Sequence, residues 1–326
     1  MRVFDLHADT MMDIANRYAL GEREVLSRRH LPHYRQGEVG ALIYALWTTN
    51  TFGEFEEYLE DAEGSAQQVM IRLLARSFQE LKATEGIEVA TTAADIERIQ
   101  AAGKVAVLLG LEGVYGFEGE LGMFDVLYDL GFRHAMFTWN DDNEFAAGNE
   151  FSSEDYGLTD LGVQAVKRME ELGMLIDVSH VSEKTFWDIM ENTSCPIMAS
   201  HSNAWTLCPC SRNLKDDQLR AIAERGGVIG MNTWRGFIKP KDAPATVDDL
   251  AAHARYIADL IGPEHVGCGF DFANYFDDED AMLPGLAHAG EAQGFVHALE
   301  RAGFSDTEIQ AICWDNAMRL ISKVCR

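Results

Sequence analysis

Two apolar stretches of the chain each end in the dipeptide Ser-His, at Ser179-His180 and at Ser200-His201. The two histidines are 21 residues apart (201 minus 180), which is about the length of one strand–helix–strand unit. In parallel α/β architectures, side chains at the carboxyl ends of neighbouring strands converge on one crevice. The spacing therefore predicts two imidazoles that face the same point, an arrangement suited to binding a metal ion.

Further potential metal ligands stand where other predicted strands end. His7 and Asp9 end the first strand, Glu112 the third and Asp271 the eighth. Because residues i and i+2 of a strand point to the same side, His7 and Asp9 can both face the barrel mouth. Taken singly, Asp271 could cap the next segment and Glu112 could be a turn residue, but their shared placement favours a metal site. Six groups exceed the needs of one tetrahedral catalytic ion, so a two-metal site bridged by a carboxylate is predicted, with zinc the expected metal. The six groups are His7, Asp9, Glu112, His180, His201 and Asp271.

The elements that must position these residues are short apolar runs bounded by Gly, Asn, Asp or Pro, separated by segments of helical periodicity. The predicted strands are Val3–His7, Ala41–Thr48, Lys104–Glu112, Arg133–Trp139, Met174–His180, Pro196–His201, Gly227–Thr233 and His265–Asp271. The predicted helices are Glu54–Ala83, Ala94–Ala101, Met123–Leu130, Thr159–Leu172, the segment 181–193, Asn213–Glu224, Val247–Ile261, Glu291–Ala302 and Asp306–Ile321, with a long polar loop at Asn140–Tyr156. Since closure removes the exposed edges of a sheet, we expect an α/β fold in which residues 1–326 form a single (β/α)8 TIM-type barrel domain.

The composition limits the classes of partner that the protein is expected to bind. The chain has 326 residues, a formal net charge of −26 and a pI near 4.6, which argues against nucleic acid and anionic membrane surfaces as partners. No apolar run of about 18 residues and no signal peptide is apparent, so a cytoplasmic location is expected. The six cysteines are expected to be reduced, and Cys208-Pro209-Cys210 is more typical of incidental loop cysteines than of a metal or redox pair.

Longer motifs spread over nearly the whole chain resemble the membrane (renal) dipeptidase family, binuclear-zinc barrel enzymes related to the amidohydrolases. They are FDLHADT near the start, LPHYRQGEVGA at 31–41, GLEG around Glu112, LTDLGVQAVKRMEELGMLIDVSHVS at 158–182, SHSNAWTLCPCSRNLKDDQLRAIAERGGVIGMN at 200–232, HVGCGFDF at 265–272 and DNAMRLI near the end. The block at 200–232 is the most specific of these motifs.

The resemblance implies an activity and a role for each site residue. His7 and Asp9 would bind one zinc ion, His180 and His201 the second, and Glu112 would bridge the two. Arg212 would bind the terminal carboxylate of the substrate, and Asp271, beside the bridging solvent, would transfer protons. The implied substrates are dipeptides, including ones with a D-residue at the C-terminal position, and the family tends to form homodimers.

One position departs from the family pattern. The family carries a histidine at the end of strand four, where this chain has Trp139 in the run FRHAMFTWND. His134 is not expected to replace it, since an odd offset projects to the opposite face of a strand. An indole can donate one hydrogen bond but cannot be positively charged, so oxyanion stabilisation and substrate choice are affected. Two alternatives follow: a binuclear amidohydrolase acting on another amide, such as an acyl-D-amino acid or a cyclic amide, and a non-catalytic metal-binding barrel.

Overall fold

The computed structural model describes residues 1–49, 63–150, 154–240, 243–272, 274–275 and 283–326. Eight parallel strands form a closed barrel in which each strand pairs with its two neighbours and β9 pairs with β1. A further strand, β3 (Ile87–Val89), pairs only with β4. The barrel strands are β1 (Val3–Ala8), β2 (Val39–Trp47), β4 (Val105–Glu112), β5 (Phe132–Met136), β6 (Leu175–Asp177), β7 (Met198–Ala199), β8 (Val228–Met231) and β9 (Val266–Cys268). The predicted TIM-type barrel is confirmed.

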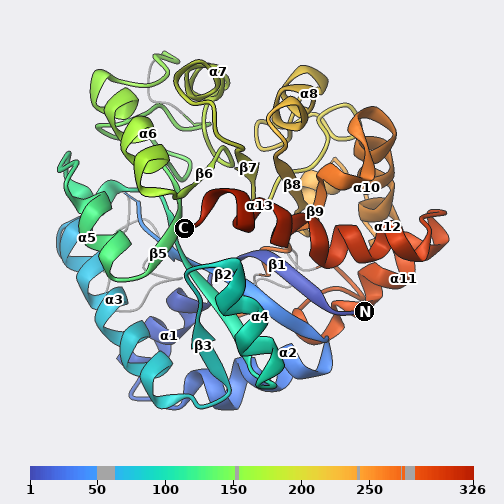
Figure 1. Ribbon diagram of the computed structural model, residues 1–326, viewed down its shortest axis with the longest axis horizontal. Coiled ribbons are helices and arrows are strands. Elements are labelled where there is room, and N and C mark those ends of the chain that lie inside the picture. The colour runs from blue at the N-terminus through green and yellow to red at the C-terminus, as the bar shows by residue number, and fades with distance from the viewer. Residues whose placement is uncertain (50–62, 151–153, 241–242, 273, 276–282) are drawn as a thin grey trace.

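Helices surround the strands as an outer ring (Figure 1). They are α1 (Thr10–Ala19), α2 (Leu31–Gln36), α3 (Ala66–Ala83), α4 (Ala93–Ala101), α5 (Met123–Asp129), α6 (Asp160–Leu172), α7 (Glu183–Asn192), α8 (Asp216–Glu224), α9 (Arg235–Ile238), α10 (Val247–Ile261), α11 (Gln293–Arg301), α12 (Asp306–Gln310) and α13 (Asn316–Val324), with short 3-10 or π turns at Leu26–His30, Tyr115–Phe117, Pro263–His265, Ala289–Glu291 and Ala311–Asp315. Local signals set several ends: Thr159 caps α6 by accepting from the Gly162 N–H, and Gly173 ends it in the left-handed conformation at φ 78°.

Several predicted helix boundaries were wrong. The helix predicted over Glu54–Ala83 begins at Ala66, where Ser65 and Gln68 form a capping box, and residues 54–62 lie outside the described residues. The helix predicted over Asp306–Ile321 is interrupted by the π turn at Ala311–Asp315. The helix predicted from Asn213 begins at Asp216, since Lys215 is still extended at ψ 160°. Helices α1 and α2 and strand β3 were not predicted.

One end of the barrel is closed by α13, which crosses the middle of the view in Figure 1. Its buried face packs with inward-facing strand residues such as Phe4, Leu6 and Leu108. Asn316 donates to the carbonyl of Pro263, which precedes β9, and to that of Val266, its first residue. The helix therefore lies at the amino-terminal end of the strands, opposite to the end where the predicted ligands stand.

Candidate metal centre and substrate cavity

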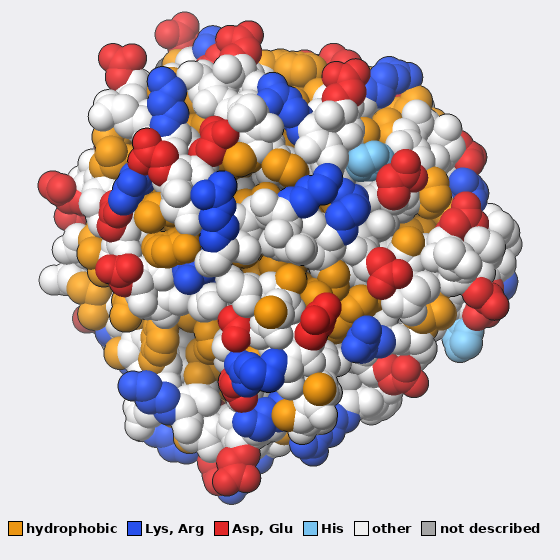
Figure 2. Space-filling view, in the orientation of Figure 1, with side chains coloured by type: hydrophobic (Ala, Val, Ile, Leu, Met, Phe, Trp, Pro, Cys, Tyr) orange, Lys and Arg blue, Asp and Glu red, His pale blue; other side chains and the backbone are white. Residues whose placement is uncertain are grey.

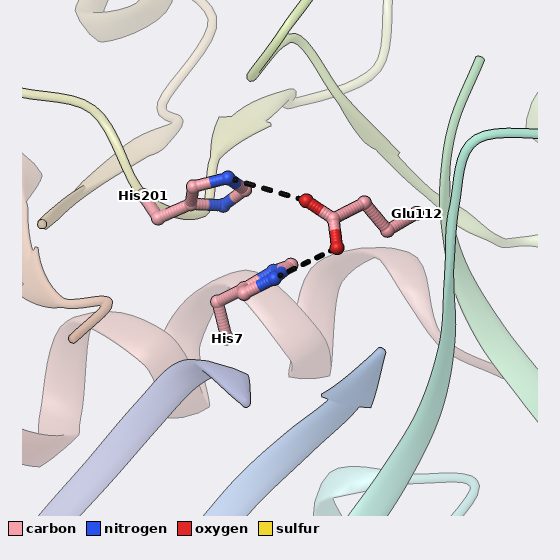
Figure 3. Close-up of side chains that lie close together, drawn as sticks. All are labelled: His7, Glu112 and His201. Atoms are coloured by element: carbon pink, nitrogen blue, oxygen red, sulfur yellow. Dashed lines mark ion pairs between the residues drawn. The ribbon is translucent and has the colours of Figure 1, made fainter. Parts of the chain in front are cut away.

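The carboxylate of Glu112, the last residue of β4, lies among three imidazoles, and Figure 3 shows one of its oxygens directed at His7 and the other at His201. Its Oε2 is 3.4 Å from Nε2 of His7. Its Oε1 is 3.2 Å from Nε2 of His180 and 3.6 Å from Nε2 of His201. The two oxygens thus face different histidines, which is the division expected of a carboxylate that bridges two cations.

Asp9 and Asp271 complete the cluster on the His7 side. Nε2 of His7 is 3.6 Å from Asp9 Oδ1 and 3.9 Å from Asp271 Oδ1. Asp9 is the N-cap residue of α1, yet its side chain makes no capping hydrogen bond. The ligand atoms of His7, Asp9 and Asp271 lie within 4.8 Å of one another, as do those of His7, Glu112 and His201. The structure therefore brings all six predicted residues together at the carboxyl ends of the strands.

Three atoms of the cluster are buried without a hydrogen-bond partner among the described residues: His7 Nε2, Asp9 Oδ1 and His201 Nε2. Both histidines are fully buried. Buried polar atoms are nearly always paired in native proteins, so unpaired ligand atoms that face a common point call for a cation. Imidazole and carboxylate together suit zinc and related divalent ions. The residues present therefore fit a divalent metal centre.

Glu112 and Asp271 are protonated more readily than ordinary acids, because their pKa values are raised. Burial, together with the nearby Asp9 carboxylate, raises the pKa of Glu112 to about 8. Burial likewise raises the pKa of Asp271. A divalent cation among these groups would favour their ionised forms, because its charge opposes both effects.

The three histidines differ in their affinity for protons. Burial lowers the pKa values of His180 and His201 well below the usual range, and the neighbouring Arg212 and His7 lower them further. Burial also opposes a charge on His7, but the carboxylates of Glu112 and Asp9 outweigh it and raise the pKa of His7 well above the usual range. Neutral imidazoles are the metal-binding form, so His180 and His201 are already in the state that a metal requires.

Each imidazole is also held through its second ring nitrogen. Nδ1 of His180 is 2.8 Å from Asn140 Oδ1, and Nδ1 of His201 is 2.7 Å from Ser200 Oγ. The same Ser200 oxygen is 3.5 Å from Nδ1 of His7. The amide oxygen of Asn140 can only accept, so it places the proton of His180 on Nδ1 and leaves the Nε2 lone pair directed at the cluster. The hydroxyl of Ser200 can accept from Nδ1 of His201 in the same way. Neither Asn140 nor Ser200 was predicted to act in the site.

Two buried carboxylates outside the metal cluster accept hydrogen bonds from the backbone segments that carry its ligands. Asp177, at the end of β6, accepts from the backbone N–H groups of Ser179 and Ser200, at 2.8 and 3.1 Å, and lies 2.7 Å from Nε2 of His134. Burial opposes its ionisation, yet the bond to His134 and the other hydrogen bonds lower the pKa of Asp177 to about 2. His134 is thus engaged with Asp177, in agreement with the expectation that it does not replace the family histidine.

Asp5 has the same role where β1 pairs with β9. Its Oδ1 accepts from the backbone N–H groups of His7 and Phe270, at 3.3 and 2.8 Å, so it joins β1 to the segment that carries Asp271. Burial raises the pKa of Asp5 to about 7. Asp5 and Asp177 each stand as a single acid within an apolar run, VFDLH and MLIDV, and that signal could have identified them.

The strands are shorter than predicted on the side of the site. His180 lies three residues beyond the end of β6 at Asp177, and Asp271 three residues beyond the end of β9 at Cys268. Both adopt the left-handed conformation, with φ of 65° and 55°. Positive φ is uncommon outside glycine and concentrates at functional sites, where the surrounding structure compensates for its cost. His201 and Trp139 also follow the ends of their strands, β7 and β5, rather than belonging to them.

A cavity of about 390 Å³ lies over the cluster. Part of its wall is aromatic: the ring of Trp139 meets that of Trp47 edge to face, with centroids 5.4 Å apart, and lies 6.0 Å from the ring of His180. Trp139 was predicted to contact substrate and does line this cavity. The other residues, apart from Arg212 and cluster members, were not predicted: Met12, Trp47, Asn140, Glu150, Ser211, Trp234 and Phe237.

Arg212 lines the same cavity as a buried cation, 7% exposed. Its guanidinium donates to the carbonyl of His201 at 3.4 Å and lies 5.4 Å from the ring centre of Phe237, while Nε has no partner. Among the described residues it forms no ion pair, and burial lowers its pKa. A buried charge without a counter-ion is costly, so this guanidinium is suited to receiving an anionic group from a ligand.

Comparison with known proteins identifies the family. The family model for membrane dipeptidases (peptidase family M19) matches residues 1–326. The chain belongs to this family. It is a metal-dependent dipeptidase, as its sequence motifs predicted. No helix among the described residues is both long and apolar enough to cross a bilayer.

Proteins of similar sequence occur in Klebsiella pneumoniae and Schizosaccharomyces pombe. An uncharacterized protein encoded in the pqqA 5′ region of Klebsiella pneumoniae is 35% identical over 242 residues, which cover 72% of this chain and 87% of that protein. An uncharacterized dipeptidase of Schizosaccharomyces pombe is 29% identical over 342 residues, covering 99% of this chain and 80% of that protein.

Solved structures share the fold. A metallopeptidase of Rhodobacter sphaeroides, liganded with a phosphinate mimic of the dipeptide L-Ala-D-Ala, superposes with a TM-score of 0.87 at 23% identity, covering 99% of both chains. The probable dipeptidase PvdM of Pseudomonas aeruginosa gives a TM-score of 0.85 at 19% identity, covering 99% of this chain and 95% of that one.

Proposed function

We propose that this dipeptidase is a binuclear zinc enzyme in which His7 and Asp9 hold one ion, His180 and His201 hold the other, and Glu112 bridges them. The observation that carries the proposal is the orientation of Glu112, whose two oxygens face His7 on one side and His180 and His201 on the other. The metal centre, when loaded, supplies an activated water and polarises the scissile carbonyl.

Asp271 is positioned to take a proton from the attacking water and to return it to the leaving amine. Asn232 donates to its Oδ2 at 3.0 Å, which leaves Oδ1 on the side of His7 and the cavity. Burial raises the pKa of Asp271, and a raised pKa suits a carboxylate that must accept and then release a proton.

Arg212 and Glu150 give the cavity two poles for a short peptide with free ends. Arg212 would take the terminal carboxylate through two parallel hydrogen bonds, and Glu150, which lines the same cavity, would pair with the free ammonium group. Substrates with a D-residue at the C-terminal position are included in the proposal, since the carboxylate anchor does not itself select one configuration.

The proposal is tested by measuring metal content by mass spectrometry and turnover of L,L and L,D dipeptides. We expect two zinc ions per chain in wild type and cleavage of both series. Glu112→Gln should abolish turnover and lower the metal content, because an amide cannot bridge two cations as a carboxylate does. Wild-type turnover by that variant would refute the assignment of the site.

A second candidate is hydrolysis of an acylated amino acid, and the aromatic wall of Trp47 and Trp139 is the observation that favours it. An apolar acyl group would bury its surface against these rings. Cleavage of N-acyl amino acids in preference to dipeptides with the same C-terminal residue would move this candidate ahead.

We also propose a cytoplasmic location and a small-molecule substrate without nucleic-acid or membrane partners. All six cysteines are free, which supports a reducing compartment. On the face shown in Figure 2, basic and acidic side chains are interspersed rather than gathered into a basic patch. The homodimer implied by the family remains a prediction, which sedimentation of the purified protein would test.

A further inference from the structure

A second cavity, which we call the side cavity, adjoins the cavity over the metal cluster and has a volume of about 320 Å³. The two cavities share three lining residues: His180, Ser211 and Arg212. The guanidinium of Arg212 therefore stands at the border between them. A substrate whose carboxylate lies on Arg212 has its C-terminal α-carbon at this border.

Apolar side chains form one part of the side-cavity wall. They are Val178, Val181, Phe186 and Leu214, each less than 9% exposed. A wall of this kind can bury the aliphatic stem of a side chain. The cavity is large enough for any single amino-acid side chain, so its polar groups must provide the selection.

Two polar atoms at the side cavity lack partners. Ser202 lines the cavity and is 1% exposed, and its Oγ has no hydrogen-bond partner among the described residues. Asn149 donates from Nδ2 to Ser211 at 3.3 Å, whereas its Oδ1 is buried and has no partner in the described part of the chain. A hydroxyl can donate or accept, and an amide oxygen accepts. Together they offer a hydrogen-bonding pair to a ligand that enters the cavity.

Charged side chains also surround the side cavity, and only some of them form ion pairs. Lys215 forms an ion pair with Glu183 at 2.7 Å, and both side chains are about half exposed. Asp155 accepts from the backbone N–H of Lys184 at 2.9 Å and from the hydroxyl of Ser182. Asp155 lines the cavity without an ion pair among the described residues, so its carboxylate repels an acidic side chain. Arg212 is the other unpaired charge, and the substrate carboxylate would occupy it. The side cavity therefore disfavours an acidic side chain.

We propose that the side cavity is the subsite for the side chain of the substrate's C-terminal residue and that it selects a neutral, hydrogen-bonding side chain: a hydroxyl or a carboxamide on a short aliphatic stem. This inference rests on the proposed function, since it requires the carboxylate to lie on Arg212. The C-terminal α-carbon carries three substituents besides hydrogen. With the carboxylate on Arg212 and the amide nitrogen toward the metal cluster, the side chain points into the adjoining side cavity.

The test compares kcat/KM for dipeptides that share one N-terminal residue and end in Gly, Ala, Ser, Asn, Gln or Asp, each chiral residue in both configurations. In wild type we expect Ser and Asn to exceed Ala, and Asp to fall below it because the carboxylate of Asp155 repels an acidic side chain. Ser202→Ala should lower kcat/KM for the Ser and Asn substrates about 3- to 10-fold, the effect of one neutral hydrogen bond, and leave the Gly and Ala substrates unchanged. Ser77→Ala is the matched control, because Ser77 is equally buried and unpartnered but lies on α3, outside both cavities.

A second variant tests the volume of the subsite without removing a polar group. Val181→Leu should lower kcat/KM for substrates ending in Gln more than for those ending in Ser, because the longer side chain reaches further into the cavity. If the Gly and Ala dipeptides are cleaved but neither variant changes the order of side chains, the subsite is overturned and the proposed function stands. If no dipeptide is cleaved, both are overturned.

Discussion

Replacing Arg212 by methionine separates a substrate anchor from a structural arginine. The substitution keeps most of the side-chain length and removes the guanidinium. Two charge-assisted hydrogen bonds to a carboxylate contribute about 1.5–3 kcal/mol each, so their loss amounts to about 3–6 kcal/mol. At about 1.4 kcal/mol for each tenfold change, kcat/KM should fall roughly 10²- to 10⁴-fold.

The same substitution should have little effect on the free energy of unfolding. Arg212 makes one long hydrogen bond, to the carbonyl of His201 at 3.4 Å, and no ion pair among the described residues. Its loss, about 0.5–1.5 kcal/mol, is offset by removal of a buried charge that lacks a counter-ion. An arginine in a buried ion pair would instead cost about 3–5 kcal/mol on removal.

The assay pairs each dipeptide with its C-terminal amide, which has no carboxylate. Arg212→Met should abolish the preference of wild type for the free acid, and urea unfolding should change by less than about 1 kcal/mol. Arg225→Met serves as control, since Arg225 donates to the carbonyls of Met190 and Thr193 away from the cavities and should affect stability rather than kcat/KM. An equal loss of activity on acid and amide, or a large loss of stability, would refute this account of Arg212.

Three further perturbations address the metal centre, the cavity wall and a half-buried histidine pair. Ser200→Ala removes the hydroxyl beside two ligand imidazoles and should weaken zinc binding about 10- to 100-fold in chelator competition, whereas Ser77→Ala should bind zinc like wild type; unchanged affinity would contradict the role given to this hydroxyl. Trp139→His should raise dipeptide turnover by restoring a side chain that can carry positive charge near the oxyanion, and a flat result would place Trp139 outside the reacting end of the cavity. His33 lies 2.9 Å from His288, Nδ1 to Nδ1, and burial together with the neighbouring cations lowers the pKa of His33 below 6.5. The unfolded chain then binds the proton more tightly than the folded one, so the contribution of His33 to the free energy of unfolding should be complete above pH 6.5 and decline below it. His33→Gln should reduce that decline when unfolding by urea is measured between pH 7.5 and 5.5. Equal slopes of stability against pH for both proteins would contradict the prediction.

Periodicity and residue type were enough to predict the barrel and the six clustered side chains. Strand ends such as Glu112 coincide with the observed ones, because an apolar run bounded by glycine leaves little freedom in where a parallel strand stops. The boundaries at His180 and Asp271 were wrong, since apolar residues continue beyond the last ladder pair and the backbone then turns into the left-handed region. No pattern in the residues distinguishes these two conformations from extended ones.

The supporting residues depend on contacts that are distant along the chain. Asn140 meets His180 across 40 residues, and Ser200 meets His7 across 193. Trp47 was predicted only as a strand residue, although it lies at the carboxyl end of its strand, as Glu112 does, and could have been predicted to line the site for the same reason. Helix α1 was missed because its apolar residues follow directly on the first strand, and Asp9 was considered a strand-end ligand rather than also an N-cap.

The helix that closes the amino-terminal end of the barrel bears on how the protein is made. On the ribosome, α13 is synthesised after every strand, so the inward-facing Phe4 and Leu6 remain without their cover until translation has passed Val324. The ligands of the metal cluster span from His7 to Asp271 and come together only when β9 pairs with β1. Contacts so distant in sequence form late and slowly. We therefore expect nascent fragments that end before β9 to lack a complete cluster and to bind no metal at this site.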